Sequence, residues 1–250
     1  MPQPSLSFPS WLPLWMQAHD VVLWGAADLR DFPTPEDEKG ERFPAALSWA
    51  VPVDPSIMLR VQEGPNEPYA AEYRRINTRI NRLAEMLAAE IRGRGHRAQP
   101  LPASERTDTA GIKGDFPQKT GATRAGLGWI GKHCQLITRA HGSWVRLGMV
   151  FTDMDLPCGP PMERNFCGRC ARCVEACPAG ALKNRPWHPG LPREQILDVQ
   201  ACDAWKKEHF FEYNAGHICG ICSAVCPHAL KTIRNGSRNP QRTTTHITPA

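Results

Sequence analysis

The sequence lacks the features that direct a chain to a membrane or out of the cell. Its N-terminal residues have no basic start, and Pro9 and Pro13 interrupt their apolar stretch, so they do not form a signal peptide. No twin-arginine motif lies near the start, and no apolar run approaches the roughly 20 residues of a membrane-spanning helix. We therefore expect a cytoplasmic protein without a membrane partner, in a compartment where thiols stay reduced.

Acidic residues are missing from the C-terminal end. None follows Glu212, whereas four Lys and Arg residues do, in a chain whose formal net charge is +5. Such a segment can attract nucleic acid. A solvated tail is the simpler interpretation, because residues 233–250 have little apolar surface to bury. We expect these residues to form a basic, flexible tail.

Cysteine, by contrast, is abundant and regularly spaced. The run from Cys167 to Pro178 has the spacing C-x2-C-x2-C-x3-C-P, in which the fourth cysteine ligates the other cluster of a two-cluster ferredoxin. A second motif, C-x2-C-x3-C-P, spans residues 219–227 but has one cysteine fewer, and Cys202 is the candidate replacement. The spacing predicts two 4Fe-4S clusters: cluster one on Cys167, Cys170, Cys173 and Cys226, and cluster two on Cys177, Cys202, Cys219 and Cys222.

Other interpretations of these cysteines remain open. C-x2-C pairs also bind zinc, although zinc sites usually present two separated pairs. Disulfides require an oxidising compartment, which the absence of an export signal disfavours. Cys202 is alternatively a buried structural cysteine, which would leave cluster two one thiolate short. Cys134 and Cys158 are expected to be packing or loop cysteines.

Strand and helix patterns alternate along the N-terminal part of the chain. Residues 19–29 and 45–53 predict buried strands, and residues 134–138 and 144–152 predict a hairpin. Residues 68–92 predict an amphipathic helix, because apolar residues recur at three- and four-residue intervals. These apolar residues are Ile76, Ile80, Leu83, Leu87 and Ile91.

A change in composition divides the chain. PCGPPMERN, residues 157–165, predicts a linker between two domains, and 250 residues suffice for one medium and one small domain. We expect an α+β protein with an N-terminal α/β domain over residues 1–156. A ferredoxin-like two-cluster module over residues 157–232 follows, and then the tail.

A glycine-rich segment precedes the predicted linker. Gly126, Gly128 and Gly131 spell G-x-G-x-x-G, a weak signal for dinucleotide binding. Its position after the first strands, and before a predicted hairpin rather than a long helix, argues against that function. Glycines at this density do let a backbone approach a flat ligand closely.

The combination of these motifs resembles the epoxyqueuosine reductase family, which is related to the reductive dehalogenases. AGLGWIGK lies upstream of both cysteine motifs, and DVVLWGAADL, ALSWAVPV and GPNEPYAAEYRRIN extend the resemblance over about residues 19–230. The resemblance implies that the N-terminal domain is of the corrinoid-binding type and holds a cobalamin against the two-cluster module, which passes it single electrons. It places the following residues near the cofactor: Ala125, Gly126, Leu127, Gly128, Trp129, Ile130, Gly131 and Lys132.

Two departures from the family pattern concern the substrate. The family's C-terminal helical-repeat domain, which helps to hold tRNA, has no counterpart in this sequence. The family's proton-donating aspartate lies in a V-D-T-G-P type segment, and an ungapped match puts Ile112 at its position. Asp115 and Asp108 are nearby but out of register, and Lys119 is a further polar candidate for a catalytic role. Solvated surface side chains are the simpler interpretation of all three.

The sequence thus predicts a cobalamin-dependent iron–sulfur oxidoreductase that acts on an unidentified substrate. A cytoplasmic flavodoxin- or ferredoxin-type protein is the expected electron donor. One alternative is an electron-transfer or corrinoid-handling protein without a substrate of its own, because the aspartate and the helical-repeat domain are missing. The other is tRNA queuosine modification proper, in which the basic tail takes the place of the missing domain.

Overall fold

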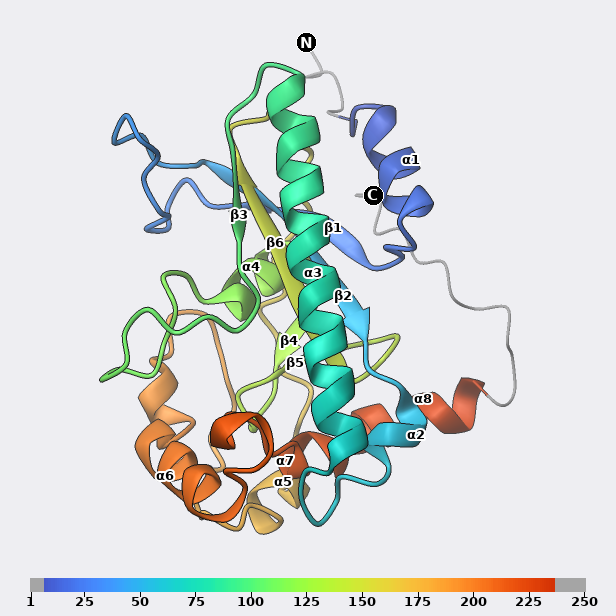
Figure 1. Ribbon diagram of the computed structural model, residues 1–250, viewed down its shortest axis with the longest axis vertical. Helices are drawn as coiled ribbons and strands as arrows, with labels where there is room; N and C mark the ends of the chain where they lie inside the picture. The colour runs from blue at the N-terminus through green and yellow to red at the C-terminus, as the bar shows by residue number, and fades with distance from the viewer. Residues whose placement is uncertain (1–6, 237–250) are drawn as a thin grey trace.

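A four-stranded sheet forms the centre of the protein, whose computed structural model describes residues 7–236. The strand order is β1 (Trp24–Asp28), β2 (Ala45–Pro52), β6 (Val145–Thr152) and β3 (Ala98–Leu101). All three neighbouring pairs are antiparallel (Figure 1). The expected mixture of helix and sheet is confirmed. A loop rather than a crossover helix joins β1 to β2, and β6 separates β2 from β3.

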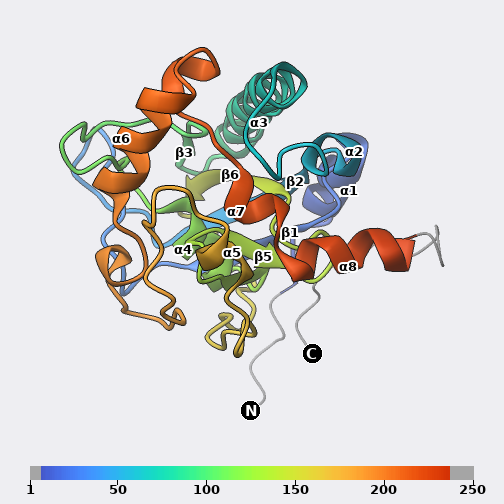
Figure 2. The ribbon, with the colours of Figure 1, turned by 90° about the horizontal axis from the view of Figure 1, so that it is seen from below.

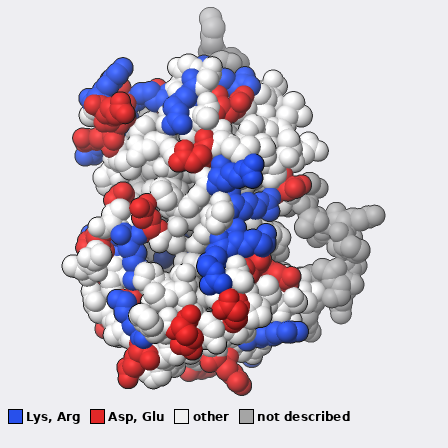
Figure 3. Space-filling view, viewed as in Figure 1, with Lys and Arg blue, Asp and Glu red and all other residues white. Residues whose placement is uncertain are grey.

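The predicted long helix is α3 (Glu67–Gly93), which lies across one face of the sheet (Figure 1). The Asn66 side chain caps its first turn by accepting a hydrogen bond from the Tyr69 amide, 3.0 Å away. All five predicted apolar side chains are buried. Charged side chains occupy the opposite face, where Lys and Arg residues form a row over the helix (Figure 3). Arg74, Arg75 and Arg82 are exposed there.

The predicted hairpin is wrong in its pairing. β5 (Leu136–Thr138) pairs with the preceding β4 (Gly128–Ile130), while β6 joins the main sheet. Two backbone hydrogen bonds between Thr138 and Gly142 close a tight turn between β5 and β6. The Val53 amide then donates to the Trp144 carbonyl at 2.9 Å, which holds the start of β6 beside β2.

Short helices carry the cysteine motifs and gather at one end of the sheet (Figure 2). Within residues 7–236, no helix combines the length and apolar composition that crossing a bilayer requires. The remaining helices are α1 (Trp11–Ala18), α2 (Pro55–Met58), α4 (Gln118–Arg124), α5 (Arg172–Glu175), α6 (Val199–His209), α7 (Ile221–Ala224) and α8 (Pro227–Gly236), with 3₁₀ turns at Arg193–Gln195 and Asn214–Gly216.

The cysteine-bearing part shares a hydrophobic core with the sheet. Ser143 Oγ and Trp144 Nε1 both donate to the Ser223 carbonyl, at 3.1 and 2.9 Å. Gly142 has a φ of +57°, and a Cβ there would lie 2.2 Å from the Ala229 Cα, so only glycine fits this contact. The two expected domains are therefore packed against each other.

The C-terminal helix extends beyond the boundary expected from the sequence. α8 continues to Gly236, four residues into the segment predicted as a flexible tail. The rest of that segment, residues 237–250, lies outside the described residues.

Candidate cysteine centres and an adjoining groove

The predicted ligands of cluster one surround a single small cavity. Cys167, Cys170, Cys173 and Cys226 line it together with Lys132, His133, Ile137, Pro227 and His228. Local hydrogen bonds fix the first loop: the Cys167 amide donates to Asn165 Oδ1 at 2.8 Å, and the Cys170 amide to the Cys167 carbonyl at 3.1 Å. Asn165 Nδ2 in turn donates to the Ile130 carbonyl of β4 at 2.7 Å, which ties the loop to the sheet part.

The predicted ligands of cluster two also lie together. Cys202, Cys219 and Cys222 line one cavity, and Cys177 is close enough to Cys202 and Cys219 to interact with their charges. Cys202 stands in the first turn of α6, where the Asp198 side chain accepts from the Ala201 amide at 3.0 Å. Cys202 thus lies beside the irregular second motif, as the sequence argument expected of the cysteine that replaces its missing ligand.

Burial sets the electrostatics of these thiols. It raises the pKa of Cys173 and of Cys219 to about 11, and that of Cys222 well above the usual value. Thiolates in such surroundings need a cationic centre close by, and iron bound by four of them provides one. Among residues 7–236, no three Cys, His, Asp or Glu side chains are placed to hold a single metal ion. Thiols spread around a cavity suit a cluster, which is larger than one ion.

The two cysteines left over belong to neither set. Cys134 is buried with its Sγ 3.6 Å from Lys119 Nζ. Cys158 is half-buried in the connection after β6, and burial raises its pKa to about 11. Both lie where packing or loop cysteines were expected.

A long groove leads to the cluster-two cysteines. Its first part is a cavity of about 760 Å³, lined by the loop 101–119, by Phe32 and Pro33, and by residues of β5 and β6. A second cavity of about 380 Å³ shares Gln135, Val145, Arg146 and part of the same loop, and it reaches the three cysteines Cys202, Cys219 and Cys222. We call the two cavities together the groove.

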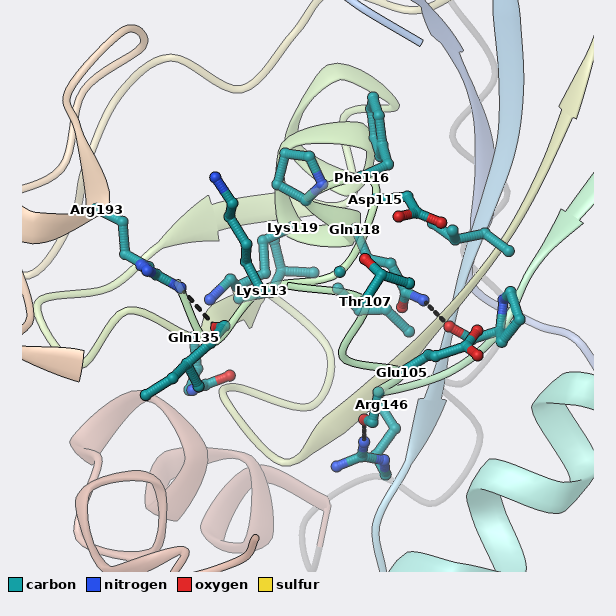
Figure 4. A pocket seen from close by; sticks show the side chains of 18 of the residues that line it. Glu105, Thr107, Lys113, Asp115, Phe116, Gln118, Lys119, Gln135, Arg146 and Arg193 are labelled. Atoms are coloured by element: carbon teal, nitrogen blue, oxygen red, sulfur yellow. Dashed lines mark hydrogen bonds between the residues drawn. The ribbon is translucent and has the colours of Figure 1, made fainter. Parts of the chain in front are cut away.

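The groove has charged walls of opposite sign. Lys113, Lys119 and Arg193 lie on one side, and Asp115 and Glu105 lie on the other (Figure 4). The size of the groove and its mixed lining suit a large ligand with both polar and apolar parts.

Hydrogen bonds and ion pairs hold the loop that forms the wall. Arg193 donates to the Gly111 and Ile112 carbonyls at 2.8 and 2.9 Å. Arg106 pairs with the buried Asp203 of α6 at 2.9 Å. Burial alone would raise the pKa of Asp203, but hydrogen bonds from Lys207 and Arg106 lower it to about 2.

Arg146 of β6 is held in place at the junction of the two cavities. Its Nε donates to Asn77 Oδ1 at 2.5 Å, and it also hydrogen-bonds Ser104. Its guanidinium lies 3.9 Å from the centre of the Tyr73 ring. A cation fixed in this way can bind an anionic or amide group of a ligand in the groove.

The structure separates the predicted catalytic candidates. Asp115 and Lys119 line the groove, and Lys119 Nζ donates to the Cys134 carbonyl at 2.6 Å. Asp108 does not line it: its carboxylate accepts from the Gly111 amide at 2.7 Å, which lowers its pKa, and it serves a turn. Ile112, at the position of the family's aspartate, lines both cavities.

Two acidic residues of the groove, Glu105 and Glu194, were missed by the sequence argument, and Glu194 pairs with Arg193 at 3.0 Å. Glu105 lines both cavities and is exposed. For Glu105, the sequence shows only an acidic residue in the same polar loop as Asp108. No local sequence feature distinguishes the two carboxylates.

The glycine-rich segment does not line the groove. None of residues 125–132 lines either part of the groove. A Cβ on Gly128 would lie 2.1 Å from the Ile137 carbonyl oxygen, so this glycine permits close pairing of β4 and β5. The last residue, Lys132, is buried at cluster one, where Nζ donates to the Cys170 carbonyl and to Asn184 Oδ1 at 3.0 and 2.9 Å. The prediction that this segment contacts cobalamin stays a prediction.

Comparisons with known proteins agree with this arrangement. Residues 166–229 match the family described as "4Fe-4S double cluster binding domain". The epoxyqueuosine reductase of Pseudomonas aeruginosa is 36% identical over 190 residues, which cover 68% of this chain and 46% of that protein. The enzyme of the same name from Gloeobacter violaceus is 36% identical over 134 residues, 49% of this chain and 39% of that protein. The resemblance inferred from the sequence is confirmed.

Solved structures show the same fold. A B12-dependent reductive dehalogenase has a TM-score of 0.66 at 17% identity, covering 96% of this chain and 35% of that one. An epoxyqueuosine reductase solved with a tRNA stem loop has a TM-score of 0.56 at 18% identity, covering 96% of this chain and 68% of that one.

The matches cover different shares of the chains that are compared. The chain spans less than half the length of the two curated relatives described above. The domain match confirms the prediction of two 4Fe-4S clusters, and the relatives share the name of a reductase.

Proposed function

We propose that this chain is a cobalamin-dependent iron–sulfur reductase in which the groove holds the corrinoid beside cluster two. The observation that carries the proposal is that Cys202, Cys219 and Cys222 are among the residues that line the groove. Electron transfer requires the donor and acceptor to be close, and a ligand in this groove lies next to the cluster without any rearrangement of the chain.

The groove residues fit a corrinoid in size and in chemistry. Phe32, Leu101 and Leu147 offer apolar surface for a flat macrocycle, while Gln135 and Arg146 offer hydrogen bonds for its amide and phosphate groups. Bound cobalamin supplies a cobalt centre that accepts single electrons and reacts with an electrophilic substrate. The protein positions that centre and the protons that the reaction consumes.

Proton delivery falls to the polar side chains of the groove. Reductive removal of an epoxide oxygen as water takes two electrons and two protons, so an acid must stand near the substrate. Asp115, Glu105 and Lys119 line the groove and can supply protons. We propose that one of the two carboxylates acts in place of the aspartate whose position Ile112 occupies.

Cluster one lies beside a surface suited to an electron donor. A cavity of about 310 Å³ next to it is lined by Trp129, Phe166, Arg139, His228 and Lys231, and His228 also lines the cluster-one cavity. The Arg139 guanidinium lies 5.6 Å from the centre of the exposed Phe166 ring. An apolar residue framed by cations suits an acidic flavodoxin- or ferredoxin-type protein.

Transfer RNA is the substrate carrier that the relatives favour. One structural neighbour was solved with a tRNA stem loop, and a row of exposed Arg residues follows α3 on the face shown in Figure 3. If tRNA binds there, its affinity must fall steeply with salt. The basic tail was predicted over residues 233–250, of which residues 237–250 lie outside the described part of the chain.

A second candidate function is electron transfer or corrinoid handling without a substrate. Ile112 favours it, because an apolar side chain lines the groove where the family places its proton donor. Under that function the loaded protein reduces its bound corrinoid but turns over no epoxide.

Anaerobic reconstitution tests the proposal and separates the two candidates. The protein should hold about eight irons, bind one cobalamin, and convert an epoxyqueuosine-containing tRNA stem loop to the deoxygenated product. Cobalamin binding without any product would favour the second candidate. An iron-loaded protein that retains no corrinoid would overturn the first candidate and leave only electron transfer from the second.

A further inference from the structure

A buried histidine directly after the glycine-rich segment lines the cluster-one cavity. His133 is 3% exposed and lines the cavity formed by Cys167, Cys170, Cys173 and Cys226. Its Nε2 is fully buried and has no hydrogen-bond partner among the described residues. A buried polar group without a partner is costly, so such a group usually serves a ligand.

A backbone hydrogen bond fixes the tautomer of this imidazole. The Gln135 amide donates to His133 Nδ1 at 3.1 Å, so Nδ1 carries no hydrogen. The proton of the ring is then on Nε2, which makes Nε2 a donor. Burial, with the positive charge of Lys119 next in effect, lowers the pKa of His133 to about 4 and agrees with a neutral ring.

Glycine at position 131 makes room for the ring. A Cβ on Gly131 would lie 2.8 Å from His133 Cε1 and 2.6 Å from the Ile137 side chain. Gly131, the last glycine of the G-x-G-x-x-G pattern, therefore leaves the space beside it for the imidazole ring. The motif supports a histidine at cluster one rather than a bound dinucleotide.

We propose that His133 donates its Nε2–H to a sulfur of cluster one and thereby raises the reduction potential of that cluster. The inference rests on the cluster assignment in the proposed function. A one-electron reduction makes the cluster and its thiolates more negative, so a hydrogen bond to sulfur stabilises the reduced form more than the oxidised form. The buried Lys132 ammonium, bound to the Cys170 carbonyl at 3.0 Å, acts in the same direction.

The test compares His133→Leu, His133→Gln and His141→Leu in the iron-loaded, full-length protein. The leucine at 133 removes the donor, the glutamine keeps an N–H of similar reach, and His141 is a half-buried histidine that lines neither cluster cavity. Potentiometric titration followed by electron paramagnetic resonance gives the potential of each cluster. We expect H133L to lower the reduced-to-oxidised ratio of one cluster about tenfold at a fixed potential, about 59 mV for one electron. The cluster potentials of H133Q should lie close to those of wild type, and the potentials of H141L should equal those of wild type.

A second measurement covers the case in which H133L loses its clusters. Wild-type protein with ¹⁵N-labelled histidine should show a weak nitrogen coupling and an exchangeable-proton coupling at one reduced cluster. Unchanged potentials in H133L with about eight irons bound, equal shifts of both clusters, or the absence of these couplings would overturn the inference. A wild-type protein that holds no clusters would instead overturn the proposed function.

Discussion

At the scale of single residues, the assignment of cluster two depends most on Cys202. Spacing alone predicts the other ligands, because C-x2-C turns and a following C-P are local features that any surrounding fold preserves. Cys202 is 17 residues before Cys219, and the packing of α6 against the turn Asn214–Gly216, which precedes the second motif, brings it to the others. Spacing does not identify which candidate carboxylate of the loop lines the groove. Asp115 and Glu105 line the groove while Asp108 caps a turn, a distinction set by the path of the loop.

Replacing Cys202 should therefore remove one cluster only. Cys202→Ala should lower the iron content of the reconstituted protein from about eight to about four and leave the cluster-one signal intact. Cys158→Ala is the matched control, since this half-buried cysteine belongs to neither set, and it should keep both clusters. Iron analysis and spectroscopy of the reduced proteins make the comparison. A C202A protein with two intact clusters would show that Cys202 is only structural.

At the scale of elements, two of the contacts that join the cysteine-bearing helices to the sheet part can be tested separately. One is the packing of the β5–β6 turn on α8 through Gly142 and Ala229. The other is the Arg106–Asp203 ion pair between the groove loop and α6. The sequence predicted the long helix from periodicity and placed strands over β1, β2, β5 and β6. It mispaired β5 with β6, because β4 was not recognised as a strand and the partners of β6 lie far away in the chain.

Adding a methyl group at Gly142 should strain the first contact. Gly142→Ala places a Cβ against the backbone of α8 at positive φ, so we expect a loss of about 2 kcal/mol in the free energy of unfolding. Gly95→Ala is the control, because Gly95 also has positive φ but no atom within 4 Å of the added Cβ. Denaturant unfolding should show the larger loss for G142A. Equal losses would mean that strain at φ, rather than packing on α8, accounts for the effect.

Breaking the ion pair should loosen the groove wall. Arg106→Met leaves the buried Asp203 with Lys206 and Lys207 alone, so we expect a cost of about 1 kcal/mol and about tenfold weaker cobalamin binding. Arg82→Met, on the exposed face of α3, should change neither quantity. Thermal unfolding and a cobalamin titration are the measurements. An R106M protein that binds cobalamin as tightly as wild type would show that this pair does not hold the binding conformation.

At the scale of the whole molecule, the proposed function has electrons pass from cluster one to cluster two and on to the groove. Cluster one lies beside a basic surface cavity, and cluster two beside the groove. The sequence predicted both clusters and, by resemblance, the corrinoid. By resemblance it also placed corrinoid contacts in the glycine-rich segment, which stays a prediction. In the structure, Ile137 of β5 lies close to Gly128 and Gly131, and His133 lies close to Gly131.

The surface at cluster one should govern the rate of reduction by a protein donor. Arg139→Glu reverses a charge beside Phe166, so we expect the KM for an acidic flavodoxin or ferredoxin to rise about tenfold while reduction by dithionite is unchanged. The measurement is steady-state reduction at low ionic strength, where the charge effect is largest. Arg30→Glu, at an exposed site away from the cluster cavities, is the control. Equal behaviour of the two variants would place the donor elsewhere.

The most direct test of the central claim is an anaerobic cobalamin titration of the iron-loaded protein. The groove beside cluster two predicts that protein with about eight irons binds one cobalamin per chain. The cobalt signal should then change on reduction, and C202A should slow this change even though it still binds the corrinoid. An iron-replete protein that retains no cobalamin, or whose bound cobalamin is reduced equally fast without cluster two, would contradict the account.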